Sequence, residues 1–154
     1  MDPAHPADRI ETLSEAECLR LLATVPLGRV VYTAHALPGV LPVAFRVEPD
    51  GRLVLALLPG GTLSRALDGT VTAFQADDVD VAAGHGWSVT VHGHTAVVRD
   101  PRTYWELLRS GPKPWVPEPE PMFVVLTPEL VVGQRLSPAP VGGEVSPRHR
   151  VCAG

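Results

Sequence analysis

The chain has 154 residues, of which 45% are hydrophobic and 19% charged, a composition typical of one globular domain with its own core. Lys and Arg number 13 against 17 Asp and Glu, giving a formal net charge of −4, which argues against a nucleic-acid partner or an anionic membrane surface. Cys18 and Cys152 form no CxxC pair, and the N-terminus lacks a signal peptide's basic start and apolar run. We therefore expect a cytoplasmic protein without a membrane segment.

The N-terminal part is predicted to be an arm followed by a helix. Residues 1–12 are rich in proline and charge, as expected for an arm. Ser14 followed by Glu17 is the pattern of a capping box and predicts a helix from there to about Thr24. Cys18 falls on the apolar side of this helix, where a thiol packs in the core and is inert.

After this helix the chain changes to short runs rich in valine and leucine. Strands are predicted at 29–33, 40–47, 53–58, 70–76, 87–98, 123–127 and 131–136. A helix over 102–109 is expected to begin after Asp100 as N-cap, with Pro101 in its first turn. Strands without a regular βαβ alternation predict a mainly β, antiparallel barrel with a few short helices over residues 13–136. The tail, 137–154, is rich in Pro, Gly and Arg and is expected to be disordered.

The segment LVLALLPGGTLSRAL, residues 53–67, is the most informative stretch. A buried strand runs into two glycines, and a short helix is expected to begin at or just after Thr62. Glycines allow a ligand to approach the backbone, and the first turn of a helix attracts an anion. Hydroxyls at Thr62 and Ser64 and the charge of Arg65 suit a phosphate. An ordinary strand–turn–helix with Thr62 as N-cap explains the pattern equally well.

Other candidate sites have weaker support. Trp87 and Ser88 begin a strand and suit stacking on a flat polar ligand, although a Trp that covers the barrel mouth is the simpler interpretation. His92 and His94 share one strand face at a spacing that permits metal ligation, but their polar neighbours favour solvated histidines. No GxSxG motif or carboxylate pair stands out, so the chemistry of an enzyme is expected to come from a cofactor.

The order of the segments GRVVYTAHALPGVLPVAF, PGGTLSRAL, VTAFQADDVD and GWSVTVHGHTAVVRDP resembles the pyridoxamine 5′-phosphate oxidase-like, FMN-binding split-barrel superfamily. Within it, the small actinobacterial and nitroimidazole-resistance-type proteins are most similar. The resemblance covers residues 13–136 and implies a Greek-key split barrel that forms a homodimer with FMN at the interface. It implies that the flavin ring is lined by Pro42, Val43, Ala44 and Phe45. It implies that the phosphate is held by Gly61, Thr62, Leu63, Ser64 and Arg65. A further polar contact is implied for Trp87 and Ser88. Segments around Trp115 and Arg135 are expected to close over the groove.

Two positions depart from the family pattern. Leu63 stands where the family commonly has Lys, and Ala44 stands where it commonly has Asn. A lost charge-assisted phosphate contact costs about 1.5–3 kcal/mol, and Arg65, two residues further along the helix, is expected to point to a different side. The resemblance implies an FMN-dependent oxidoreductase acting on a small organic substrate. The alternatives are a non-catalytic flavin, deazaflavin or haem-binding module and a cofactor-free accessory dimer.

Overall fold

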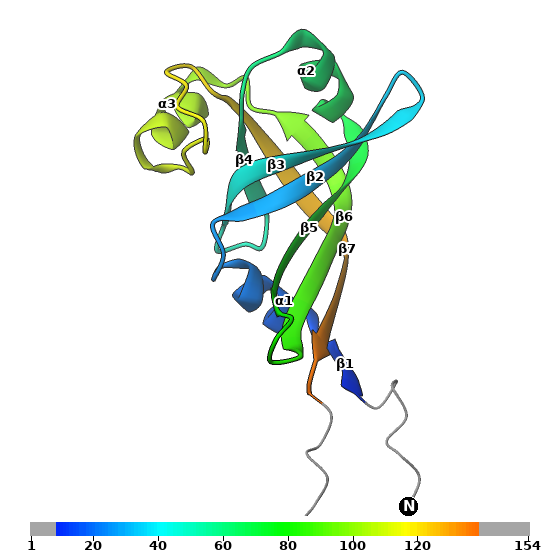
Figure 1. Cartoon of the computed structure of the whole chain (residues 1–154). Coiled ribbons are helices and arrows are strands. Elements are labelled where there is room, and N and C mark those ends of the chain that lie inside the picture. Colours follow the sequence, from blue (N-terminus) through cyan, green and yellow to red (C-terminus); the bar gives the residue numbers. More distant parts are fainter. Residues whose placement is uncertain (1–8, 139–154) are drawn as a thin grey trace, which may run out of the picture.

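The computed structural model describes residues 9–138, which form one antiparallel barrel (Figure 1). The strands are β1 (Ile10–Leu13), β2 (Leu27–Ala34), β3 (Leu37–Val47), β4 (Leu53–Leu57), β5 (Thr70–Asp80), β6 (His85–Val97) and β7 (Met122–Leu136), and the helices are α1 (Glu15–Leu22), α2 (Gly61–Leu67) and α3 (Pro101–Ser110). The predicted mainly β, antiparallel barrel is confirmed. Within the described part of the chain, no helix has the length and apolarity needed to cross a membrane.

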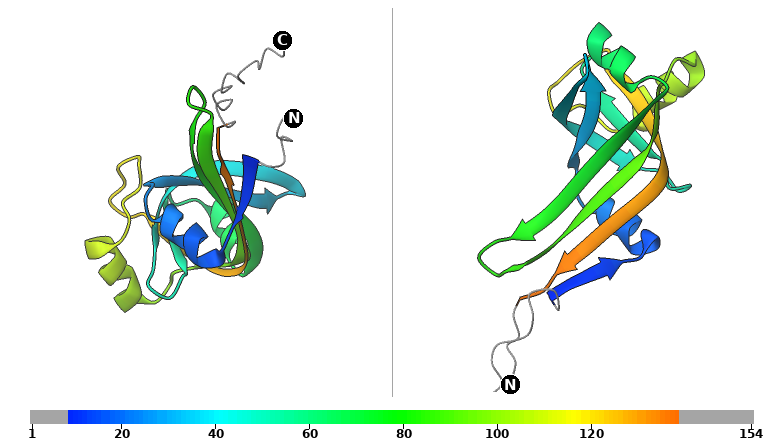
Figure 2. Two further views of the ribbon diagram at one scale, coloured as in Figure 1. Left: turned by 90° about the horizontal axis from the view of Figure 1, so that it is seen from below. Right: turned by 90° about the vertical axis from the view of Figure 1, so that its right-hand side faces the viewer.

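The sheet closes on itself through β7. The strand order is β1-β7-β4-β3-β2-β5-β6, and β7 also pairs with β6, so six strands complete the barrel and β1 is added beside β7. Strands β2, β3 and β4 follow one another, whereas β5 returns to lie beside β2, which is a Greek-key arrangement. The long connection from β4 to β5 carries α2. This helix therefore lies over one end of the barrel, near the tip of the β2–β3 hairpin (Figures 1 and 2).

Strand β4 is buried on both faces, which accounts for its continuous apolar sequence LVLAL. One face contributes Leu53, Leu55 and Leu57 to the core inside the barrel. The other face, with Val54 and Ala56, packs in a second cluster that includes residues of α3. Helix α3 thus covers the outside of the barrel at β4.

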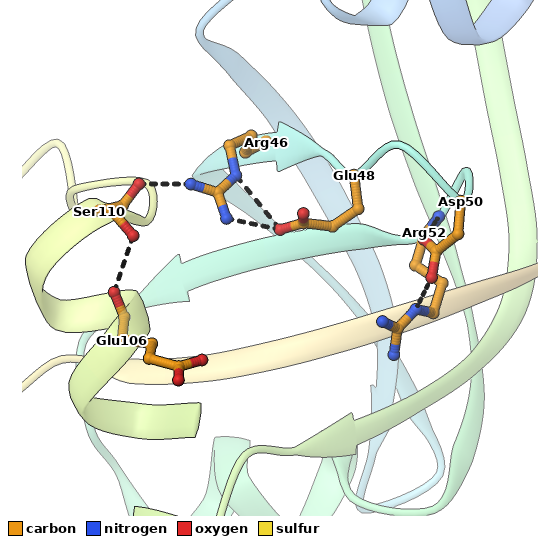
Figure 3. A network of polar contacts seen from close by, with 6 residues as sticks. All are labelled: Arg46, Glu48, Asp50, Arg52, Glu106 and Ser110. Atoms are coloured by element: carbon orange, nitrogen blue, oxygen red, sulfur yellow. Dashed lines mark hydrogen bonds and ion pairs between the residues drawn. The ribbon is translucent and has the colours of Figure 1, made fainter. Parts of the chain in front are cut away.

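Polar contacts fix the end of α3 to β3 (Figure 3). The Arg46 guanidinium donates to the Ser110 carbonyl at the end of α3 and to Glu48 Oε1, at 2.6 Å from Nη2 and 3.2 Å from Nε. The Ser110 hydroxyl donates to the Glu106 carbonyl at 2.9 Å. Residues 111–121, which include five prolines, begin at this anchored end, and we call them the proline strap.

The helix caps agree with the sequence. Ser14 Oγ accepts from the Glu17 amide at 3.2 Å and caps α1. Asp100 caps α3 by accepting from the amide and hydroxyl of Thr103 at 3.0 and 2.8 Å. The Thr103 amide and then its hydroxyl hold the pKa of the Asp100 carboxyl below its usual value.

Three strand predictions need correction. Residues 10–12, expected in the arm, belong to β1, which pairs with the end of β7. The two expected closing strands are the single strand β7, because a bulge absorbs the break at Pro128: His92 pairs with Leu130 and Gly93 with Pro128. Strand β5 continues to Asp80, four residues beyond its predicted end. The rest of the predicted arm, residues 1–8, and residues 139–154 of the predicted tail lie outside the described residues.

Candidate functional site

A cavity of about 370 Å³ lies beside α2 and under the proline strap, and we call it the chamber. This volume is within the range of about 300–1,000 Å³ found for small-molecule sites. The chamber is bounded by parts of β2, β3, β4, α2 and the strap: Tyr32, Ala34, Leu41, Pro42, Val43, Ala56, Leu57, Leu58, Pro59, Gly60, Thr62, Leu63, Pro114, Trp115 and Val116. No charged side chain is among these residues. The chamber therefore suits a flat or compact apolar group.

Two aromatic side chains are set against the chamber by specific contacts. Tyr32 lies across Gly39 on the paired strand, where an added Cβ would come within 2.5 Å of Tyr32 Cζ. Trp115, in the strap, donates from Nε1 to the Pro42 carbonyl at 3.1 Å. The sequence analysis expected the segment around Trp115 to close over the groove but did not identify Tyr32. Its only signal was an aromatic residue in a predicted strand.

A smaller cavity of about 220 Å³ adjoins the chamber, and we call it the vestibule. It is lined by Thr33, Ala34, His35, Thr62, Arg65 and Ala66. Two of these residues, Ala34 and Thr62, also line the chamber. The vestibule offers a guanidinium, an imidazole and two hydroxyls, and no carboxylate is among its lining residues. Its donors suit an anionic group attached to whatever the chamber holds.

Helix α2 brings Arg65 back toward its own first turn. The helix begins at Gly61 with Gly60 as N-cap, so Thr62 lies inside the first turn and is not the N-cap. Arg65 Nη1 lies 3.6 Å from the position that a Cβ on Gly61 would take. Leu63 points elsewhere and lines the chamber. Arg65 and Leu63 do point to different sides, as the sequence predicted: Arg65 lines the vestibule and Leu63 lines the chamber, two cavities that share Ala34 and Thr62.

The C-terminal end of α2 is fixed to the barrel. Asp68 accepts from the Val97 amide and from Arg99 Nη2, both at 3.0 Å. The Arg99 hydrogen bond, and after it that of the Val97 amide, holds the pKa of the Asp68 carboxyl below its ordinary value. The Thr70 hydroxyl also donates to the Ala66 carbonyl at 2.6 Å. These contacts set the position of Arg65 and Thr62 relative to the barrel.

The remaining predicted residues of β3 and α2 lie away from both cavities. Ala44 and Phe45 are each 7% exposed. Phe45 packs in the core with its ring centroid 4.7 Å from that of Phe74. Ser64 lines neither cavity, although its amide donates to the Gly60 carbonyl and closes the first turn of α2.

Trp87 and Ser88 lie in a separate hollow. They line it together with Ile10, Val79, Gly86, Gln134 and Leu136, none of which borders the chamber. The start of β6 is at the end of the barrel opposite α2 (Figure 1). Ser88 Oγ accepts from Gln75 Nε2 at 3.3 Å on the outer face of the sheet. Arg135, opposite Trp87 on β7, is also away from the chamber.

The histidines and the cysteine of the described chain form no metal site. His92 and His94 are exposed on β6, and His94 contacts Glu129. Among residues 9–138 no group of three or more His, Cys, Asp or Glu side chains is placed to hold a metal ion. Cys18 is fully buried, and burial raises the pKa of its thiol, as predicted for an inert core cysteine.

The architecture and its hollow define a small antiparallel split barrel with a ligand-sized cavity at one end. The family model described as pyridoxamine 5′-phosphate oxidase matches residues 14–135. A mycobacterial relative, an uncharacterised protein of Mycobacterium tuberculosis, is 38% identical over 138 residues, which cover 84% of this chain and 88% of the relative. The chain therefore belongs to the pyridoxamine 5′-phosphate oxidase family.

Solved structures agree with this assignment. The FAD-binding protein of Mycobacterium smegmatis is 32% identical with a TM-score of 0.70, and the match covers 82% of this chain and 98% of that one. An FAD-binding protein of Mesorhizobium loti is 25% identical with a TM-score of 0.65, covering 84% of this chain and 98% of that one.

Proposed function

We propose that this protein binds a flavin nucleotide, with the ring in the chamber and the phosphate in the vestibule, and uses it as an oxidoreductase on a small organic substrate. The observation that carries the proposal is the junction of an uncharged chamber with a carboxylate-free vestibule containing Arg65. Family membership supports it. FMN is the cofactor that the sequence favours, and FAD, which two related proteins bind, carries the same ring and first phosphate.

The residues present fit such a cofactor. Tyr32 and Trp115 would contact the ring and exclude water, while Thr62 and Arg65 would bind the phosphate. Ala44 offers no polar side-chain atom and position 44 does not border the chamber, so the departure from the asparagine that the resemblance implies leaves the cavity walls unchanged. A bound flavin supplies hydride transfer, whereas the protein supplies its orientation and a dry environment.

The alternatives differ in what the chamber would have to provide. Haem needs an axial ligand such as His, Cys, Met or Tyr; Tyr32 lines the chamber and His35 lines the vestibule, so haem is an alternative ligand that the absorption spectrum would identify. A deazaflavin presents the same ring shape and phosphate as a flavin, so it remains an alternative ligand. A non-catalytic carrier and a cofactor-free accessory dimer remain alternatives to an enzyme.

A homodimer is part of the proposal. On the outer face of the sheet Val40 of β3, Val71 of β5 and Leu130 and Val132 of β7 are 61, 64, 56 and 43% exposed. Strand β2 lies between β3 and β5, and β6 lies between β5 and β7. An apolar sheet face of this kind suits a second copy of the chain. Trp87 and Ser88 are remote from the chamber of their own chain, so they would reach a flavin only from a partner.

The absorption spectrum of the purified protein tests the cofactor. We expect bound flavin with absorption near 450 nm, or its appearance after addition of FMN or FAD; a protein that binds none of these contradicts the proposal. NAD(P)H-dependent turnover of the loaded protein separates an enzyme from a carrier.

Sedimentation of the Leu130→Lys and Val81→Lys variants tests the dimer face. Val81 is an exposed position on the β5–β6 turn, so only Leu130→Lys should be a monomer. The cytoplasmic location stays a prediction from the cysteine content.

A further inference from the structure

The turn that joins β2 to β3 has an unusual backbone. Ala34 pairs with Leu37, so the loop consists only of His35 and Ala36. Both residues have positive φ, 53° and 62°, as a type I′ hairpin turn requires. That turn normally uses Asn-Gly or Gly-Gly, because a side chain is strained in the left-handed region. The sequence thus retains two side chains where glycine would be the more stable choice.

One of these strained residues borders the vestibule. His35 lines it from the hairpin, and Arg65 lines it from α2. Strained backbone that persists at the edge of a binding cavity is often retained for what the side chain does there. The Ala36 side chain is not among the lining residues of the vestibule. A role of the His35 imidazole in the vestibule therefore accounts for a non-glycine residue at this position of the turn.

We infer that His35 is a second phosphate-binding residue, which acts with Arg65 to make the protein prefer phosphorylated over unphosphorylated flavin. This inference rests on the proposed function. An imidazole carries an N–H that donates to a phosphate oxygen, and Thr33 and Thr62 add hydroxyl donors to the same cavity. The pair would supply from two elements the phosphate contact that the resemblance implies for a lysine at position 63. Leu63 is then free to line the chamber.

The test compares affinities for FMN and riboflavin, which share the ring and differ in the phosphate. His35→Gly removes the imidazole at a φ that glycine adopts freely, so the variant is expected to fold. Ala36→Gly is the matched control, because it relaxes the same turn and keeps the imidazole. Arg65→Gln removes the charge on the opposite element.

We expect wild-type protein to bind FMN more tightly than riboflavin. His35→Gly and Arg65→Gln should each weaken FMN binding about tenfold and leave riboflavin binding unchanged. Ala36→Gly should leave both affinities unchanged. The inference is overturned if wild-type protein binds both flavins equally, if His35→Gly weakens both alike, or if Ala36→Gly reproduces its effect.

If the protein binds neither flavin, the proposed function is contradicted. Anion binding by His35 and Arg65 in the vestibule is then tested without a flavin. Inorganic pyrophosphate is then titrated while the imidazole signals of His35 are followed by NMR. A saturable shift that is lost in Arg65→Gln supports an anion site shared by the two residues. No shift in wild-type protein overturns it.

Discussion

Replacing Trp115 by phenylalanine tests whether the proline strap holds the ligand in the chamber. The indole Nε1 donates to the Pro42 carbonyl at 3.1 Å, and phenylalanine keeps an aromatic wall but removes this donor. The strap is also held at its ends, by the Gly111 amide on Leu107 and by the Tyr104 hydroxyl on the Pro121 carbonyl at 2.8 Å. The Trp115 contact fixes its middle.

The expected loss follows from the energy of one hydrogen bond. A neutral hydrogen bond contributes about 0.5–1.5 kcal/mol net, and Trp115 is 57% exposed, which favours the lower half of that range. Trp115→Phe should therefore weaken FMN binding about two- to fivefold. Trp115→Ala also removes the wall and should weaken it further.

Flavin fluorescence titration measures the affinity, and hydrogen exchange of residues 111–121 reports on the strap independently of any ligand. Trp105→Phe is the matched control, because Trp105 is similarly exposed, at 61%, but lies on α3 outside the chamber. Unchanged exchange and affinity in Trp115→Phe, or an equal loss in Trp105→Phe, would refute the reasoning.

Three further substitutions probe the elements around the site. Gly39→Ala should displace Tyr32, because the added Cβ would come within 2.5 Å of Tyr32 Cζ, and should weaken flavin binding in titrations; unchanged affinity would contradict a role for Tyr32. Ala36→Gly should raise the free energy of unfolding by about 0.5–1 kcal/mol, seen as a higher melting temperature; an unchanged value would mean that the turn is not strained. The pKa of the Asp68 carboxyl is lowered in the folded protein. The contribution of its carboxylate to the stability of the fold is therefore complete at pH values above the ordinary pKa of 3.8, and it is lost as the pH falls through the lowered pKa. Melting curves from pH 7 to pH 2 should therefore fall more steeply for wild-type protein than for Asp68→Asn, and parallel curves would contradict this assignment.

Local signals predicted the fold well. The cap at Ser14, the cap and proline at Asp100 and Pro101, and the alternation along β6 each depend on neighbouring residues, and the structure confirms them. Strand β1 was missed because its extended conformation depends on pairing with β7, which is more than a hundred residues away in the sequence. Pro128 signalled a break that the bulge in β7 accommodates.

The candidate site was predicted only in part, because its walls come from segments far apart in the sequence. Pro42 and Thr62 were found through the glycine-rich pattern and the family resemblance. The sequence of the proline strap is typical of a connector, and only the folded structure shows that it lies over the chamber. His35 gave no sequence signal, since a histidine in a turn is ordinary until its backbone conformation and its neighbours are known.

The departure at position 63, where the resemblance implies a lysine, has a different meaning in the folded chain. From spacing alone, Leu63 and Arg65 on different sides of a helix suggest that one cannot replace the other. In the structure the two sides border the chamber and the vestibule, which Thr62 joins. Arg65 reaches back over Gly61, with Nη1 3.6 Å from the position that a Cβ on Gly61 would take. A cation two residues beyond position 63 can then serve the same anion, and the apolar side chain at position 63 extends the surface that meets the ring.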